Sequence, residues 1–342
     1  MRVICKVMLF YSGFNPSALT LNNDGLVSDG FSKLSEDFTE VNVMWNYSLV
    51  WKGLDLLISG DFGGGNDTRL LVSPEGSGSK FIHALAGTDT VTIVSESQKI
   101  WQYKIYEDQW REIDNFLPSN DENLEESISK IERNSCIVAL TNLGRLFNVP
   151  NLVDMPKRVK FVDVACGFNH SIILADNGDV YSMGMGTRGQ LGHGDLEDCD
   201  EPTLIEALAG LNVIQIAAGG WHNAVLTSDG DLYTWGWNTN GELGITSDQK
   251  VIALPAVVDF KTEDGNIVNE RVKKVQCGNN FTICLSVDGS LWGCGSNKYY
   301  QLGQPRADVE VTTKFIKLKT DFGSKKIVDI SCREWGTVLN VE

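Results

Sequence analysis

Three segments of this chain repeat one pattern closely enough to be aligned residue by residue. They are 161–193 (FVDVACGFNHSIILADNGDVYSMGMGTRGQLGH), 213–245 (VIQIAAGGWHNAVLTSDGDLYTWGWNTNGELGI) and 272–304 (VKKVQCGNNFTICLSVDGSLWGCGSNKYYQLGQ). Each contains an apolar run that ends near a glycine, a second apolar run, a turn that ends in glycine, a third run and a closing Leu-Gly. Self-similarity of this kind is typical of solenoids, propellers and arrays. The repeat therefore limits the fold before any single residue is considered.

Short turns separate the second and third runs of each copy. Asn177-Gly178, Asp229-Gly230 and Asp288-Gly289 stand there, and such dipeptides predict an antiparallel hairpin in which both turn residues tolerate positive φ. The runs are rich in apolar and β-branched residues, so we expect each sheet to be covered on both faces by neighbouring copies.

Glycines recur at two further repeat positions, where they suggest close backbone approach or positive φ. The first set is Gly167, Gly219 and Gly278, and the second is Gly184, Gly236 and Gly293.

Weaker copies of the same unit extend over the rest of the chain, with starts near 41, 82, 128, 161, 213, 272 and 327. The last copy has only two strands, and residues 3–19 resemble the missing part. Such an arrangement closes the array into a ring and removes open sheet edges. The sequence predicts an all-β, seven-bladed β-propeller as one domain over 1–342. Residues 192–202 and 246–271 are predicted as surface insertions and 204–211 as one helical turn.

The motifs G-x-x-H, D-G-x-L/V-Y, W-G and G-Q/E-L-G resemble the regulator-of-chromosome-condensation repeat family, whose members form seven-bladed propellers. Within the family, the motifs at 219–222 (GGWH), 235–238 (WGWN) and 332–335 (CREW) resemble small members that partner a Jumonji-type oxygenase. The resemblance implies a non-catalytic nuclear adaptor of a histone demethylase, acting in chromatin regulation and chromosome segregation. The resemblance also implies that the protein localises to the nucleus or chromosomes, with the cytoplasm as a further location. The alternative that the family implies is guanine-nucleotide exchange on a Ran-like small GTPase, which needs a wedge that the loops do not reveal.

The net charge is −16, from 29 Lys and Arg against 45 Asp and Glu. DNA affinity comes chiefly from cationic residues, so we expect no direct DNA binding. The acidic charge could attract basic partners such as histones, or it could serve only to keep the protein soluble. The sequence contains no apolar stretch of 18 residues, so we expect no membrane-spanning helix. The eight cysteines include no C-x-x-C pair, which favours a reducing compartment.

Catalytic and cofactor motifs do not stand out. His170 and His222 occupy one repeat position where the third copy has Phe281, which favours a structural hydrogen bond over a metal ligand. The glycine-rich 61–66 lacks the Lys-Ser/Thr of a phosphate loop. We therefore expect no enzyme activity, no cofactor and no metal.

Function is then expected on a propeller face, where loops of successive blades converge. Trp, Tyr and Arg are preferred interface anchors, although aromatic residues at these corners could equally hold blades apart. Candidate partner-binding residues are Phe168, Arg188, Trp221, His222, Trp237, Asn238 and Trp335, with Tyr299 beside them, and Arg158 and Lys160 of the basic 157–160 segment.

Overall fold

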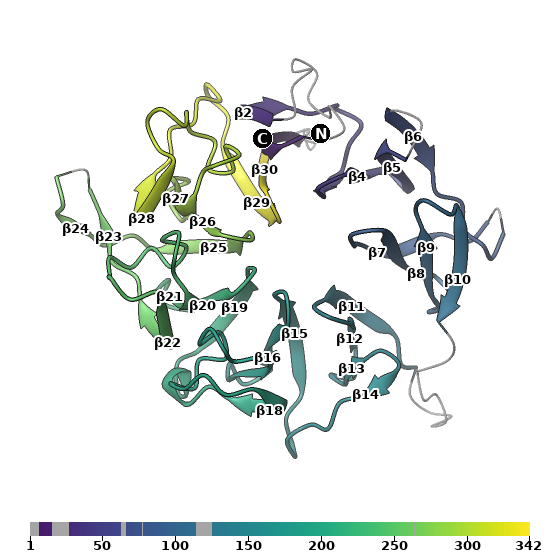
Figure 1. Ribbon diagram of the computed structural model, residues 1–342, viewed down its shortest axis with the longest axis horizontal. Helices are drawn as coiled ribbons and strands as arrows, with labels where there is room; N and C mark the ends of the chain where they lie inside the picture. Colours follow the sequence, from purple (N-terminus) through teal and green to yellow (C-terminus); the bar gives the residue numbers. More distant parts are fainter. Residues whose placement is uncertain (1–6, 16–26, 63–65, 77, 114–124, 263) are drawn as a thin grey trace, which may run out of the picture.

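Seven four-stranded antiparallel sheets lie in a ring around a central channel (Figure 1). The computed structural model describes the chain except for residues 1–6, 16–26, 63–65, 77, 114–124 and 263. The expected seven-bladed propeller is confirmed. In chain order, with the innermost strand first, blades 1 to 3 are β3 (Glu40–Val43), β4 (Tyr47–Lys52), β5 (Asp55–Asp61), β6 (Asn66–Leu70); β7 (Phe81–Ala86), β8 (Thr90–Ser95), β9 (Ile100–Lys104), β10 (Gln109–Ile113); and β11 (Ile128–Arg133), β12 (Ile137–Thr141), β13 (Leu146–Asn148), β14 (Asn151–Leu152). Blades 4 to 6 are β15 (Phe161–Cys166), β16 (His170–Ala175), β17 (Val180–Gly184), β18 (Cys199–Leu204); β19 (Val213–Ala218), β20 (His222–Thr227), β21 (Leu232–Trp237), β22 (Val251–Val257); and β25 (Val272–Cys277), β26 (Phe281–Ser286), β27 (Leu291–Ser296), β28 (Val311–Lys317).

Blade 7 joins the two ends of the described chain. Its strand order from the channel outward is β29 (Ile327–Arg333), β30 (Gly336–Val341), β1 (Met8–Phe14) and β2 (Val27–Lys33). β1 runs antiparallel to β30, with Met8 opposite Val341 and Gly13 opposite Gly336. The predicted ring closure is therefore confirmed, although 3–6 and 16–19 of the expected segment lie outside the described residues.

The apolar core lies between the blades rather than within them. Each cluster of buried apolar side chains draws from two neighbouring blades; Leu85 and Val94 of blade 2, for example, pack with Ile131 and Phe147 of blade 3. A single sheet cannot bury both of its faces, so burial at about 25 cal/mol per Å² is gained only when blades stack.

Outer strands account for the main difference from the sequence interpretation. β18 and β22 fall largely inside segments predicted as insertions, and β2 was not predicted at all. β18 buries only Pro202, because one side of an outer strand faces solvent, so it lacks an apolar signature. The single turn expected within 204–211 is present as the 3-10 helix η1 (Glu206–Leu208).

The hairpin turns differ from the expected type. Only the glycine of each turn has positive φ, for example +87° at Gly178 and +90° at Gly289, whereas Asn177 and Asp288 do not. Gly178 donates to the Ala175 carbonyl and Ala175 donates to the Asp179 carbonyl. This is a three-residue loop that ends in a left-handed glycine, a common hairpin connection.

The second set of recurring glycines also needs a correction. Gly184, Gly236 and Gly295 lie opposite the first residue of the second strand and have φ near +100°, whereas Gly293 does not. The Gly167, Gly219 and Gly278 set behaves as expected: a Cβ on Gly219 would collide with the His222 ring and the Gly278 carbonyl oxygen.

Replacing Gly289 by Ala is expected to destabilise the protein by about 1 kcal/mol. A Cβ there would meet nothing within 4 Å, so the cost is purely that of the +90° φ angle. Urea unfolding measures it. Gly289→Asn should recover part of the loss because Asn tolerates the left-handed region, and a Gly289→Ala variant as stable as the parent would contradict the turn geometry.

Candidate functional site

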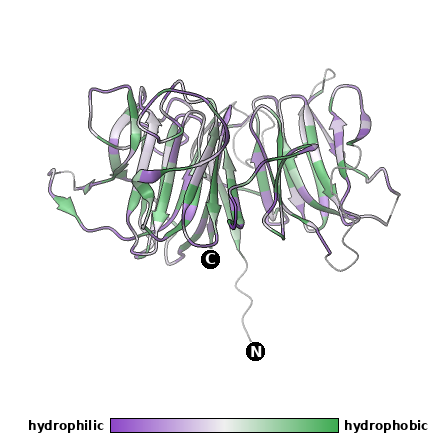
Figure 2. Cartoon of the chain, turned by 90° about the horizontal axis from the view of Figure 1, so that it is seen from below, coloured by the Kyte–Doolittle hydropathy of each residue, from purple (hydrophilic) through white to green (hydrophobic). Residues whose placement is uncertain are grey.

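The ring has two loop-bearing faces (Figure 2). Because successive strands run antiparallel, links from first to second and from third to fourth strands lie on one face, which we call the corner face. The hairpin turns between second and third strands, and the links between blades, lie on the other, the turn face. Segments 167–169 and 185–198 of blade 4 are thus on the corner face, and 176–178 on the turn face.

The corner face brings four of the predicted residues together in one group, which we call the Arg188 cluster. Phe168 is 42% exposed and meets the Trp221 ring edge-on, with centroids 5.4 Å apart. The Arg188 guanidinium lies 4.1 Å from the centroid of Trp221 and 5.4 Å from that of Trp237. These side chains come from two corners, one third-to-fourth-strand link and the last residue of β21, so no local stretch of sequence contains the group.

A second aromatic group, the seam cluster, lies where blade 7 meets blade 1. It contains Trp335 and Tyr299, which the sequence indicated, together with Phe14 and Trp45, which it did not. Trp45 is 52% exposed and occupies the corner position that Phe168 has in blade 4, since Met44 donates to the Tyr47 carbonyl as Gly167 does to His170. Aligning this weak copy at its corner could have found Trp45.

Two of the predicted contact residues, His222 and Asn238, are buried, with 1% and 8% of their surface exposed. His222 Nε2 is 2.9 Å from Thr282 Oγ1 of blade 6, and His170 Nε2 is 2.8 Å from Asn223 Oδ1 of blade 5. Burial lowers the pKa of His222 to about 3 and that of His170 to about 4, so both stay neutral at pH 7. Asn238 Oδ1 accepts from Leu243 N and holds its own loop. These contacts favour a structural role for the side chains of His222 and Asn238.

Arg158 and Lys160 lie on the turn face, in the exposed link between β14 and β15. They are therefore on the opposite side of the ring from the Arg188 cluster. One partner surface cannot include both groups unless the partner reaches around the rim.

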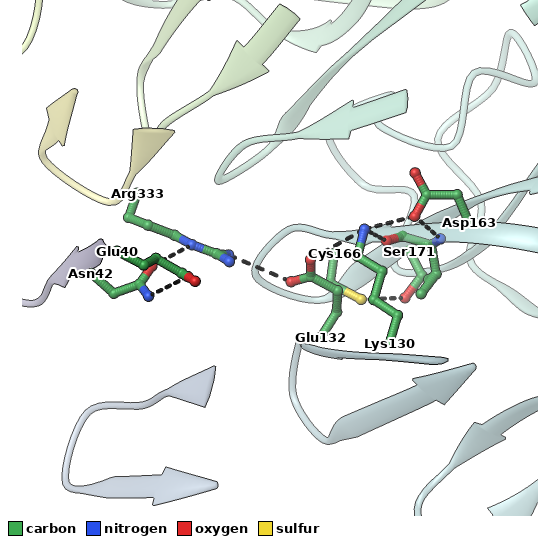
Figure 3. Close-up of polar contacts among 9 residues, drawn as sticks. Glu40, Asn42, Lys130, Glu132, Asp163, Cys166, Ser171 and Arg333 are labelled. Atoms are coloured by element: carbon green, nitrogen blue, oxygen red, sulfur yellow. Dashed lines mark hydrogen bonds and ion pairs between the residues drawn. The ribbon is translucent and has the colours of Figure 1, made fainter. Parts of the chain in front are cut away.

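A chain of polar contacts crosses the central channel (Figure 3). Arg333 Nε donates to Asn42 Oδ1 at 3.0 Å, and Arg333 Nη1 lies 3.5 Å from Glu132 Oε2 on the far wall. Lys130 Nζ is 3.5 Å from Glu132 and 2.7 Å from Asp163. Burial by itself lowers the pKa of Lys130. The Glu132 and Asp163 carboxylates raise it by more, so the pKa of Lys130 lies above its usual value. The chain of contacts links blades 1, 3, 4 and 7 and keeps the lysine charged.

A cavity of about 230 Å³ opens at the corner-face end of this channel. All seven blades line it, including Met44, Asn134, Phe168 and Glu334. Within the described residues no three His, Cys, Asp or Glu side chains are placed to hold a metal ion. The described part of the chain also contains no helix long and apolar enough to cross a membrane.

Comparison with known proteins agrees with this architecture. Two family profiles described as the regulator of chromosome condensation (RCC1) repeat match, one at 177–226 and 229–285 and the other at 161–190, 213–242 and 272–301. Human WBSCR16 has the same fold, with a TM-score of 0.77, 16% identity and coverage of 98% of this chain and 100% of that chain. Prp20p from Saccharomyces cerevisiae, whose binding properties to Gsp1p and histones are described with its structure, gives a TM-score of 0.76 at 15% identity, covering 99% and 92%.

Curated relatives match over shorter stretches. Human RCC1 domain-containing protein 1 is 31% identical over 214 residues, which is 51% of this chain and 54% of the relative. The Arabidopsis thaliana ultraviolet-B receptor UVR8 is 39% identical over 145 residues, 42% of this chain and 31% of the receptor. Human E3 ubiquitin-protein ligase HERC2 is 38% identical over 165 residues, 47% of this chain and 3% of the ligase. The matched stretches thus span about half or less of these relatives. With the repeats at 161–301 and the seven-bladed ring, the chain is a propeller that contains regulator of chromosome condensation (RCC1) repeats.

Proposed function

We propose that the chain, as one propeller domain over 1–342, is a non-catalytic protein-protein interaction scaffold that binds a partner through its corner face. The Arg188 cluster supports this proposal most directly. It combines Trp and Arg, two of the residues most enriched at binding hot spots, as half-buried side chains beside the exposed Phe168. The guanidinium stacked over Trp221 is already ordered, so binding would cost little side-chain entropy.

The family resemblance suggests the partner. We propose a Jumonji-type oxygenase, with the chain acting as its adaptor in the nucleus and in histone demethylation. The link 185–198 that carries Arg188 also carries the exposed carboxylates Asp195, Glu197 and Asp198, which would favour a basic partner surface, including histones.

The two groups of candidate residues on opposite faces allow a direct test. Binding of a purified candidate Jumonji oxygenase to the chain is measured by biolayer interferometry, with Trp221→Ala as the corner-face variant and Arg158→Ala as the turn-face variant. We expect Trp221→Ala to weaken binding by about 30-fold or more and Arg158→Ala to leave it unchanged. Loss with Arg158→Ala alone would move the site to the turn face. Equal binding by all three proteins would contradict both contact regions.

The alternative is nucleotide exchange on a Ran-like small GTPase, and one structural feature favours it. The hairpin of β23 (Phe260–Lys261) and β24 (Ile267–Val268) lies outside the seven sheets and projects beyond the ring (Figure 1). It supplies the projecting element that the sequence did not reveal. Release of a fluorescent guanine nucleotide from Ran separates the two functions. We expect no acceleration by the chain, and acceleration that disappears when 262–266 are replaced by a two-glycine link would establish exchange instead.

A further inference from the structure

The seam cluster brings three rings from blades 1, 6 and 7 together at one point of the corner face. Its rings Trp45, Tyr299 and Trp335 are steeply inclined to one another, with interplanar angles of 80° for Trp45 with Tyr299, 71° for Trp45 with Trp335 and 78° for Tyr299 with Trp335. The ring centroids are 6.0, 6.3 and 5.5 Å apart in the same order. Phe14 stacks on Trp45 at 4.4 Å and 12°, which fixes the orientation of the most exposed ring.

These distances match three walls around a single positive charge. A cation about 4 Å above the faces of two perpendicular rings places their centroids about 6 Å apart, within the range of cation–π attraction. Quaternary ammonium groups are bound in this way by aromatic cages. A ring in the cluster also has a cation against it, since Lys298 Nζ lies 5.4 Å from the Tyr299 centroid.

Charges of both signs lie near the cluster, and a bound cation would have to displace Lys298 from the face of Tyr299. Glu334 is the chain neighbour of Trp335 and lines the channel-mouth cavity together with Met44, the neighbour of Trp45. Burial raises the pKa of the Glu334 carboxyl, and Arg333 opposes this only in part. Arg333 itself is engaged by Asn42 and Glu132. A partly buried carboxyl group thus lines the channel-mouth cavity, one residue along the chain from Trp335.

We propose that the seam cluster binds the trimethylated ammonium group of a methyl-lysine side chain presented by a partner protein. Trp45, Tyr299 and Trp335 form the walls, Phe14 supports Trp45, and Glu334 adds negative potential. A trimethylammonium group suits this site better than a plain ammonium, because it spreads its charge over methyl groups that pack on the rings and lose little hydration. The inference rests on the proposed scaffold function only in requiring a protein partner, and it concerns a different part of the corner face.

Titration calorimetry with the purified full chain tests it. The probes are a short basic peptide with one central lysine, unmodified or trimethylated, and the same peptide with a neutral tert-butyl isostere of trimethyl-lysine. We expect the trimethylated peptide to bind at least about tenfold tighter than the other two. Equal binding of the neutral isostere would reduce the site to plain apolar contact and overturn the proposal. Free tetramethylammonium is expected to bind far more weakly than the peptide; equal affinity would make the ligand a small ammonium ion instead.

Variants of the seam cluster test which side chain carries the preference. Trp45→Ala should abolish the preference for trimethyl-lysine, and Trp45→Phe should retain part of it. Leu54→Ala is the control, a 68% exposed turn-face side chain outside both aromatic clusters, and should bind like the parent. An unchanged preference in folded Trp45→Ala would overturn the assignment. Because no oxygenase is present, failure here is separate from failure of the interferometry test above.

Discussion

Deleting residues 1–14 is expected to abolish folding of the whole propeller rather than to weaken one blade. β1 contributes Leu9, Tyr11 and Phe14, each less than 9% exposed, and Leu9 and Tyr11 belong to the core between blades 7 and 1. At about 1.5–3 kcal/mol for each buried apolar side chain, the loss is comparable with the whole stability of a typical domain. The deletion also leaves β30 as an unpaired sheet edge, so we expect aggregation. Soluble yield, light scattering and circular dichroism measure the effect.

A circular permutant provides the matched control. Met8 lies opposite Val341 in the sheet, so joining Glu342 to Met1 and opening the chain between the exposed Glu36 and Asp37 keeps every strand of blade 7. This protein should fold with cooperative melting close to that of the parent. If the 1–14 deletion melts like the parent, or if the permutant also fails to fold, ring closure by β1 does not carry the stability assigned to it.

The repeat predicted the ring because each blade buries its apolar runs against the next, and burial leaves the clearest trace in sequence. β16, β20 and β26 are buried at every position, and all three lie in strong copies. In outer strands such as β18, charged residues stand at several positions and little is buried. Their sequence could therefore not be distinguished from that of a loop. β2 could not be predicted because it follows no repeat pattern, although its partner β1 lies close to it in the sequence.

The candidate site was predictable residue by residue but not as a group. Phe168, Trp221 and Arg188 could be singled out as residues of corner-face loops, yet their contacts depend on how two blades stack. The direction of the His222 side chain could not be predicted from its corner position, and its ring turns inward to Thr282. Phe14 was missed because its neighbours Trp45 and Tyr299 belong to other blades.

Replacing Glu242 by Gln is expected to stabilise the protein by about 3 kcal/mol at pH 8 and to have almost no effect near pH 4. Glu242 is 1% exposed, and burial raises the pKa of its carboxyl from 4.5 to about 7, although hydrogen bonds from Asn240 oppose the rise. The folded state therefore holds a proton that the unfolded chain releases between these two values. Stability falls as pH rises through that window and stays lower above it.

The repeat itself indicates that Gln fits this position. Gln190 and Gln301 stand at the equivalent place in blades 4 and 6, and each accepts one backbone N–H, from Arg188 and Tyr299 at 2.8 and 2.7 Å. Glu242 accepts Asn240 N at 2.6 Å in the same way, so an amide oxygen can replace the carboxylate oxygen.

Urea unfolding of parent and Glu242→Gln from pH 4 to 8.5 measures the difference, with the exposed Glu310→Gln as control. Below pH 6.5 the neutral, buried His170 and His222 act in the opposite direction, since their lowered pKa values make both proteins less stable as pH falls. This contribution is common to the two proteins and cancels in their difference. A gain in stability that is the same at pH 4 and pH 8 would show that Gln improves packing and that the carboxyl of Glu242 does not titrate near neutrality.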